Sequence, residues 1–135
     1  MKYFQWTEEL SVNIEEIDNQ HQQLVSLMNN LSVAIHMGKG DNVLGEILTK
    51  LSEYATIHFA TEERLMKIHG YPDLANHKKE HHALKNHVLE LNSRLNAGQL
   101  LPAVTVSNFL KDWIVNHFQQ TDKKYGPFLN DKGVL

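Results

Sequence analysis

Residues 74–95 read LANHKKEHHALKNHVLELNSRL, and the spacing of this stretch decides the fold. One set of positions recurs every three or four residues: Leu74, His77, His81, Leu84, Val88, Leu91 and Leu95. Steps of three and four place side chains on one stripe of an α-helix, so the spacing predicts a helix with one core-facing side. Two histidines occupy positions that such a pattern normally gives to apolar side chains.

The same spacing recurs in three other parts of the chain. It links Ile17, His21, Leu24, Met28, Leu31 and Ile35, then Leu44, Leu48, Leu51, Ala55, His58, Glu62 and Leu65, and finally Val106, Leu110, Trp113 and His117. We therefore predict helices over about residues 18–37, 41–69, 73–97 and 102–121. No stretch alternates with period two, so we expect no strands.

Glycine and proline separate these helical stretches, as is usual at helix boundaries: Gly38, Gly40, Gly70, Pro72, Gly98 and Pro102. The short connections imply antiparallel neighbours and an all-α, up-down-up-down four-helix bundle. An N-terminal arm through about residue 16 precedes the bundle. Gly126 and Pro127 indicate that a short C-terminal tail follows from about Lys123. We expect residues 1–135 to form a single domain.

The composition excludes several classes of protein. The 135 residues include 13 Lys+Arg and 16 Asp+Glu, a net charge of −3, so no basic excess favours nucleic acid as a partner. No cysteine is present, which excludes thiolate nucleophiles and cysteine-ligated metals. No apolar run approaches the ~18 residues of a membrane span, and no apolar leader is visible, so we expect a cytoplasmic protein without a membrane partner. The nine histidines are the unusual count.

Six polar side chains occupy the core-facing positions: His21, His58, Glu62, His77, His81 and His117. In an antiparallel bundle, the starts of the first and third helices adjoin the ends of the second and fourth. All six side chains are therefore expected at one end of the core, within about 10 Å. A buried imidazole or carboxylate without a partner costs several kcal/mol, and clustering from all four helices is typical of a metal site in a bundle.

A second carboxylate for this site could come from Asp122 or Asp73. Asp122 follows His117 by five residues, and five residues of a regular α-helix turn about 500°, which leaves the two side chains about 140° apart. A widened turn or π-bulge would bring them together. Asp73 lies four residues before His77, but its place after Pro72 is more typical of a helix cap or first turn.

These pieces together resemble the hemerythrin family in its short, single-domain bacterial form. The matching pieces are Trp6-Thr7, Ile17-Asp18-Asn19-Gln20-His21, His58-Phe59-Ala60-Thr61-Glu62-Glu63, His77-Lys78-Lys79-Glu80-His81 and Trp113-Ile114-Val115-Asn116-His117 with Asp122. The resemblance covers nearly the whole chain. It implies two iron ions, one bound by His77, His81 and His117 and the other by His21 and His58, with Glu62 and Asp122 bridging them.

The resemblance also implies a function. Imidazole and carboxylate suit iron, zinc, copper or nickel. With an oxo or hydroxo bridge, the implied ligands fill all but one position around two octahedral metals, and the open position suits dioxygen. By the resemblance, Ile114 lines the oxygen pocket with Trp113 and Phe59, although many members carry leucine in place of Ile114.

We therefore expect a non-heme di-iron protein that binds dioxygen reversibly as a carrier or store, and not an enzyme. Three alternatives stay open. The protein could sense oxygen or redox state through a separate partner, act as a di-iron oxidoreductase on peroxide or nitric oxide, or hold a purely structural metal.

Overall fold

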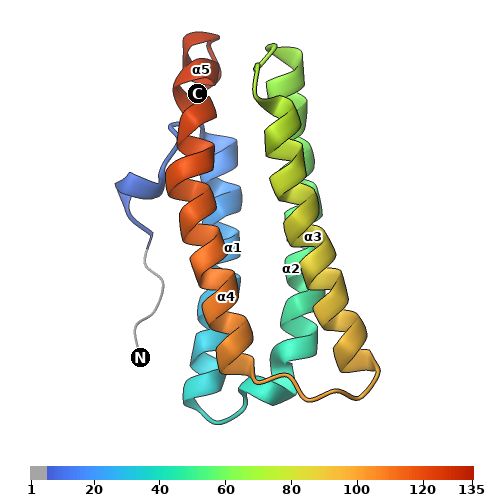
Figure 1. Ribbon diagram of the computed structural model, residues 1–135. Helices are drawn as coiled ribbons and strands as arrows, with labels where there is room; N and C mark the ends of the chain where they lie inside the picture. The colour runs from blue at the N-terminus through green and yellow to red at the C-terminus, as the bar shows by residue number, and fades with distance from the viewer. Residues whose placement is uncertain (1–5) are drawn as a thin grey trace.

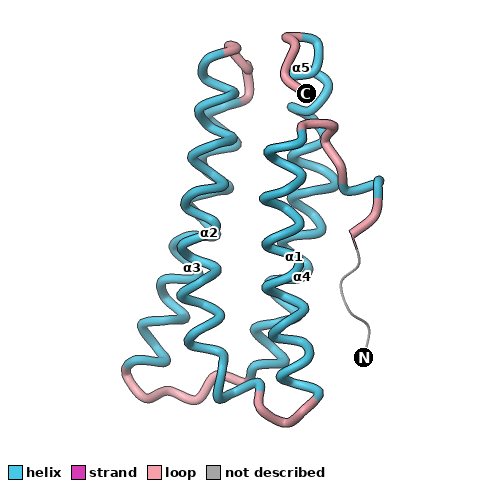
Figure 2. Tube along the Cα trace, turned by 180° about the vertical axis from the view of Figure 1, so that it is seen from behind, coloured by secondary structure: helices cyan, strands magenta, loops and turns pink. Residues whose placement is uncertain are grey.

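The computed structural model describes residues 6–135, except the side chains of residues 120 and 121. Its elements are the 3₁₀ turn η1 (Glu8–Leu10), then α1 (Glu15–His36), α2 (Gly40–Ile68), α3 (Leu74–Asn96), α4 (Ala103–Asn116), the π-helical turn η2 (His117–Thr121) and α5 (Asp122–Asp131). The chain runs up and down through four long antiparallel rods, the last formed by α4, η2 and α5 (Figure 1). No strand occurs within residues 6–135 (Figure 2), and the predicted all-α bundle is confirmed.

The arm before α1 is anchored by a carboxylate in the first turn of that helix. Asp18 accepts hydrogen bonds from the Ser11 hydroxyl at 2.5 Å and from the Val12 backbone N–H at 2.9 Å. These bonds turn the chain into the helix, which begins at Glu15 rather than near residue 18. Residues 1–5 of the predicted arm lie outside the described residues.

The prediction of a short tail from Lys123 is wrong, because α5 runs to Asp131 with Pro127 inside it. Tyr125 and Leu129 lie one turn apart and are fully buried, which favours the helix over the break that Gly126-Pro127 would produce in an isolated peptide. Glycine is favoured at position 126, because a Cβ there would stand 3.1 Å from the carbonyl oxygen of Val12, tighter than most contacts of this kind. Pro127 is exposed on the opposite side of α5.

Two apolar clusters form the core, one on each side of the polar layer predicted from the sequence. The larger cluster includes apolar core-facing positions of the first three predicted helices: Met28, Leu31, Leu44, Leu48 and Leu91. The smaller one consists of Val12, Ile14, Ile17, Met66, Tyr125 and Leu129. Four of its six residues come from the arm and α5, which the sequence analysis treated as flanking segments, and the other two come from α1 and α2. The polar layer is therefore closed by apolar side chains at both ends.

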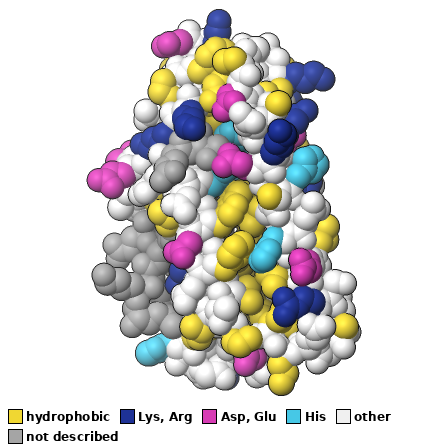
Figure 3. Space-filling model, in the orientation of Figure 1, with side chains coloured by type: hydrophobic (Ala, Val, Ile, Leu, Met, Phe, Trp, Pro, Cys, Tyr) yellow, Lys and Arg dark blue, Asp and Glu magenta, His cyan; other side chains and the backbone are white. Residues whose placement is uncertain are grey.

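The face that carries α3 and α4 shows apolar side chains between the two helices (Figure 3). A groove of about 330 Å³ lies there near the α3–α4 connection, lined in part by His87, Leu91, Leu101 and Phe109. Phe109, in the lining of this groove, is 39% exposed. Within the described residues, no helix is long and apolar enough to cross a membrane.

Candidate metal centre

All seven predicted ligands lie in the polar layer, and each is at most 3% exposed. α1 contributes His21, α2 contributes His58 and Glu62, and α3 contributes His77 and His81. His117 begins the π-turn and Asp122 begins α5. The i,i+4 pairs on α2 and α3 lie one helical turn apart, so each helix presents two donors to the same small volume. The structure thus brings together every residue that the sequence analysis placed in this site.

The π-turn brings Asp122 into the site. Regular α-helical geometry would point Asp122 away from His117, but hydrogen bonds from residue i to i+5 align residues five apart. The carboxylate oxygen Oδ1 of Asp122 lies 3.0 Å from Nε2 of His117. Asp73, the alternative, is the N-cap residue of α3, and its carboxylate accepts a 2.6 Å hydrogen bond from the side-chain amide of Asn76. The predicted departure from a regular helix is confirmed, and Asp122 is the carboxylate that joins the cluster.

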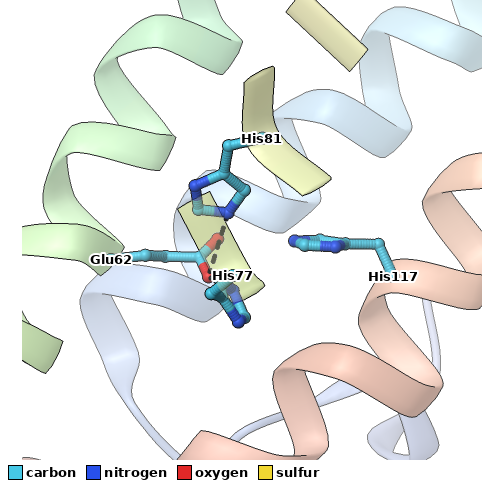
Figure 4. Close-up of side chains that lie close together, drawn as sticks. All are labelled: Glu62, His77, His81 and His117. Carbon is cyan, nitrogen blue, oxygen red and sulfur yellow. Dashed lines mark hydrogen bonds and ion pairs between the residues drawn. The ribbon is translucent and has the colours of Figure 1, made fainter. Parts of the chain in front are cut away.

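Each of the two carboxylates directs one oxygen to one group of histidines and its other oxygen to a second group. Glu62 directs Oε1 to Nε2 of His58 and Oε2 to Nε2 of His77, the latter at 2.9 Å. Asp122 directs Oδ2 to His21 at 3.0 Å and Oδ1 to His77 and His117 at 3.1 and 3.0 Å. A carboxylate placed in this way can bridge two cations. Figure 4 shows Glu62 between His77 and His81, with the His117 ring directed toward them from the opposite side.

The donor atoms fit a pair of metal ions. They form two groups, Glu62, His77, His81 and His117 in one and His21, His58, Glu62 and Asp122 in the other, and within each group one ligand atom per residue lies within 4.8 Å of the others. Nε2 of His81, Nε2 of His117 and both oxygens of Asp122 are buried without a hydrogen-bond partner. A buried polar atom without a partner costs about 1–3 kcal/mol, and a bound cation would give these atoms one. Imidazole and carboxylate together suit first-row transition metals.

Without a metal, the carboxylates are balanced by protons on some of the imidazoles. Burial disfavours charge on His21 and His77, but the close carboxylates of Asp122 and Glu62 outweigh it and raise their pKa to about 9 and about 10. Burial lowers the pKa of His81 to about 4 and also lowers that of His58. Burial opposes ionisation of Glu62 as well, yet the neighbouring His58 and His21 hold its pKa well below the usual range.

Asp122 ionises for a related reason. Burial and the nearby charge of Glu62 would raise the pKa of Asp122, but His117 and His21 hold it below its usual range. Both carboxylates are therefore ionised at neutral pH. Their two negative charges would offset half of the positive charge of a pair of divalent cations.

Aromatic rings fix the planes of three of these imidazoles. Phe59 stacks on His81 with ring centroids 3.8 Å apart, Trp113 stacks on His117 at 4.5 Å, and Phe118 stacks on His21 at 3.7 Å. Phe59 and Trp113, predicted for an oxygen pocket, thus contact ligand rings, and Ile114 is only 2% exposed. The pocket role of these three residues stays a prediction. The sequence analysis gave Phe118 no part in this site, although it contacts a predicted ligand.

Two further polar residues, Gln20 and Glu63, contact the outer nitrogens of two predicted ligands. Nδ1 of His58 lies 2.7 Å from the side-chain oxygen of Gln20, and Nδ1 of His81 lies 2.8 Å from a carboxylate oxygen of Glu63. The sequence analysis gave neither residue a role. Gln20 directly precedes His21 and Glu63 directly follows Glu62, and both lie inside the motifs that carry the family resemblance. Neither position indicates the contact itself, because each contact crosses from one helix to another.

The fold and this site together define a helical-bundle protein built to bind cations. Residues 12–129 match the sequence profile of the hemerythrin HHE cation binding domain. The chain is 34% identical over 131 residues to bacteriohemerythrin of Methylococcus capsulatus (strain Bath), covering 96% of this chain and 99% of that protein. It is 30% identical over 122 residues to myohemerythrin of Theromyzon tessulatum, covering 90% of each. The chain belongs to the hemerythrin family.

Solved structures agree with this assignment. A crystal structure of wild-type hemerythrin superposes with a TM-score of 0.87 at 33% identity, covering 95% of this chain and 98% of that one. A crystal structure of a hemerythrin variant superposes with the same TM-score at 34% identity, covering 96% and 98%. These full-length matches confirm the resemblance that the ligand spacing indicated.

Proposed function

We propose that this chain binds two iron ions in its polar layer and uses them to bind dioxygen reversibly, as a carrier or store. The observation that carries the proposal is the placement of Glu62 and Asp122, each of which presents one oxygen to each histidine group. A structural site for a single metal would not need two such carboxylates. Membership of the hemerythrin family supports the choice of iron and of dioxygen.

The two metal positions differ in the number of imidazoles. His77, His81 and His117 would hold one ion, His21 and His58 would hold the other, and Glu62 and Asp122 would bridge them together with an oxo or hydroxo group. The position with two imidazoles keeps one coordination place open. When bound, the iron pair would supply the electrons that make binding of dioxygen reversible.

The residues around the site would keep water and protons away from it. We propose that Ile114 and the rings of Phe59 and Trp113 form a dry pocket, which is how closed sites prevent side reactions. Burial, followed by the charges of Asp122 and Glu62, raises the pKa of Tyr125 well above its usual value. Tyr125, whose ring lies 5.3 Å from that of His77, therefore keeps its hydroxyl proton and is unsuited to act as a base.

The test is an oxygenation cycle on the reconstituted protein. Metal-free chain is loaded anaerobically with ferrous iron, exposed to oxygen and then flushed with argon, and its absorption spectrum is recorded at each step. We expect a charge-transfer band that appears with oxygen and disappears with argon over repeated cycles. A band that never reverses would overturn the carrier function, and turnover of added peroxide or nitric oxide would indicate an enzyme instead.

Adjacent histidines on α3 provide a matched pair of variants. His81 is buried in the site, whereas His82 is exposed. We expect His81→Ala to lose the reversible band and His82→Ala to keep it. Loss of the band in both variants would show that a general effect on α3, rather than the loss of a ligand, is responsible.

A further inference from the structure

Two side chains outside the ligand set determine which nitrogen of two imidazoles faces the site. The oxygen atoms of Glu63 and Gln20 lie 2.8 and 2.7 Å from Nδ1 of His81 and of His58. A carboxylate oxygen and an amide oxygen only accept hydrogen bonds, so Nδ1 is the protonated nitrogen in both rings. The other nitrogen, Nε2, faces the site in both rings. Nε2 of His81 is buried there without a hydrogen-bond partner, whereas Nε2 of His58 contacts Oε1 of Glu62 and lies 2.9 Å from Nε2 of His21.

A short chain of hydrogen bonds between α1 and α2 fixes the orientation of the Gln20 amide. Its nitrogen donates to the hydroxyl of Thr61 at 3.2 Å, and that hydroxyl donates to the backbone oxygen of Ile57 at 3.1 Å. The hydroxyl of Thr61 has a single proton, which Ile57 takes, so it can only accept from Gln20. The amide nitrogen is therefore committed to Thr61 and the amide oxygen to His58.

The two outer partners differ in charge, and they serve different metal positions. Glu63 lies behind His81 in the group with three histidines, and neutral Gln20 lies behind His58 in the group with two. An imidazole that donates to a carboxylate becomes a more basic ligand than one that donates to an amide. By contrast, Nδ1 of His21 and Nδ1 of His117 are buried without any hydrogen-bond partner. Both histidine groups therefore contain a ring that an outer side chain orients, and the two outer side chains differ in charge.

We propose that Glu63 and Gln20 are positioning residues for His81 and His58, and that the charge of Glu63 strengthens metal binding at the three-histidine position. The proposal rests on the two-metal centre proposed above. It goes beyond that centre because it attributes part of the difference in metal affinity between the two positions to residues that do not contact the metals. Partners of this kind typically change metal affinity by about 10–100-fold when they are replaced.

The first experiment needs no metal. Long-range ¹H–¹⁵N correlation spectra of the metal-free chain report which ring nitrogen of each histidine carries the proton. We expect Nδ1–H signals for His81 and His58 in the wild type. Glu63→Gln should keep the Nδ1–H signal of His81, because glutamine still offers an oxygen, and Glu63→Leu should lose it. An Nε2–H signal for His81 in the wild type, or an unchanged signal in Glu63→Leu, would overturn the positioning role.

The second experiment titrates the metal-free chain with Co²⁺, whose visible bands report each binding step. The wild type should bind two ions. Glu63→Gln should weaken one step by about 10–100-fold and leave the other within about twofold, and Gln20→Glu should strengthen the other step. The exposed Glu90→Gln on α3 removes the same charge away from the site and should match the wild type.

The outcomes separate this proposal from the one on which it rests. A wild type that binds fewer than two Co²⁺ ions would refute the two-metal centre, whatever the tautomers are. A wild type that binds two, with Glu63→Gln unchanged or with both steps weakened equally, would leave the centre intact and overturn the role of the Glu63 charge. Circular dichroism of each variant confirms that a weakened step does not reflect unfolding.

Discussion

Replacing Ile114 by alanine should separate the packing of the site from its metal ligands. Ile114 lies on α4, is 2% exposed and belongs to the larger apolar cluster. Truncating a fully buried isoleucine to alanine costs about 2–5 kcal/mol, toward the upper end where the surrounding side chains cannot close the cavity. Because no predicted ligand is removed, Ile114→Ala should keep the metal content of the wild type. The cavity should also admit water to the proposed oxygen pocket, so the oxygen-induced absorbance of the iron-loaded protein should decay faster.

Urea unfolding of the metal-free chain measures the packing cost, and metal analysis shows whether loading is retained. Val104→Ala, at a position on the same helix that is 53% exposed, should change the free energy of unfolding by less than about 0.5 kcal/mol. Decay of the oxygen-induced absorbance at one pH and temperature then compares wild type and variant. Equal decay rates in two folded, fully iron-loaded proteins would show that Ile114 does not exclude water from the site. A cost below about 1 kcal/mol would contradict its tight packing.

Three further predictions concern the carboxylates and the protons of the site. Asp122→Ala should abolish binding of the second metal, whereas Asp73→Ala should leave both bound in elemental analysis, and the reverse result would exchange their roles. Binding of Zn²⁺ at pH 7 should release about two protons from His21 and His77, whose pKa values of about 9 and about 10 keep them protonated without metal, and a pH indicator in weak buffer measures the release. Because the folded-state pKa values of His21 and His77 are raised, their protons stabilise the metal-free fold fully below pH 6.5, and this stabilisation is lost as pH rises through 9–10. The urea midpoint of the metal-free chain should therefore fall as pH rises from 6.5 to 10. A midpoint that rises would contradict the assignment.

The sequence was sufficient to predict the bundle and the ligand cluster, because both follow from helical spacing and antiparallel order. His21 near the start of one helix and His117 near the end of another must meet if their helices are neighbours. The π-turn could be predicted for a related reason, since a regular helix cannot bring Asp122 to His117. For the histidines a local rule of geometry left one arrangement, whereas for the second carboxylate it left Asp122 with a widened turn or Asp73, and the structure decides for Asp122.

The helix beyond Asp122 could not be predicted in this way. Gly126-Pro127 is a reliable local signal for a break, and only the burial of Tyr125 and Leu129 against the arm and α2 overrides it. That burial depends on how segments far apart in the sequence pack together, which spacing within one helix does not reveal.

The outer partners Gln20 and Glu63 were missed for a similar reason. Their positions next to His21 and Glu62 suggest nothing about His58 and His81, which lie on neighbouring helices. Predicting the contacts requires the rotation and relative height of those helices to within a hydrogen-bond length. Spacing fixes which residues share a face, but it does not fix interhelical distances at that precision.

The central claim is that Glu62 and Asp122 bridge two metal ions held by five histidines. A crystal structure of the iron-loaded chain, with anomalous difference maps measured at the iron absorption edge, tests it most directly. The account predicts two peaks per chain, one in contact with His77, His81 and His117 and the other with His21 and His58, and both carboxylates in contact with both peaks. A single peak, or two peaks that share neither carboxylate, would contradict it.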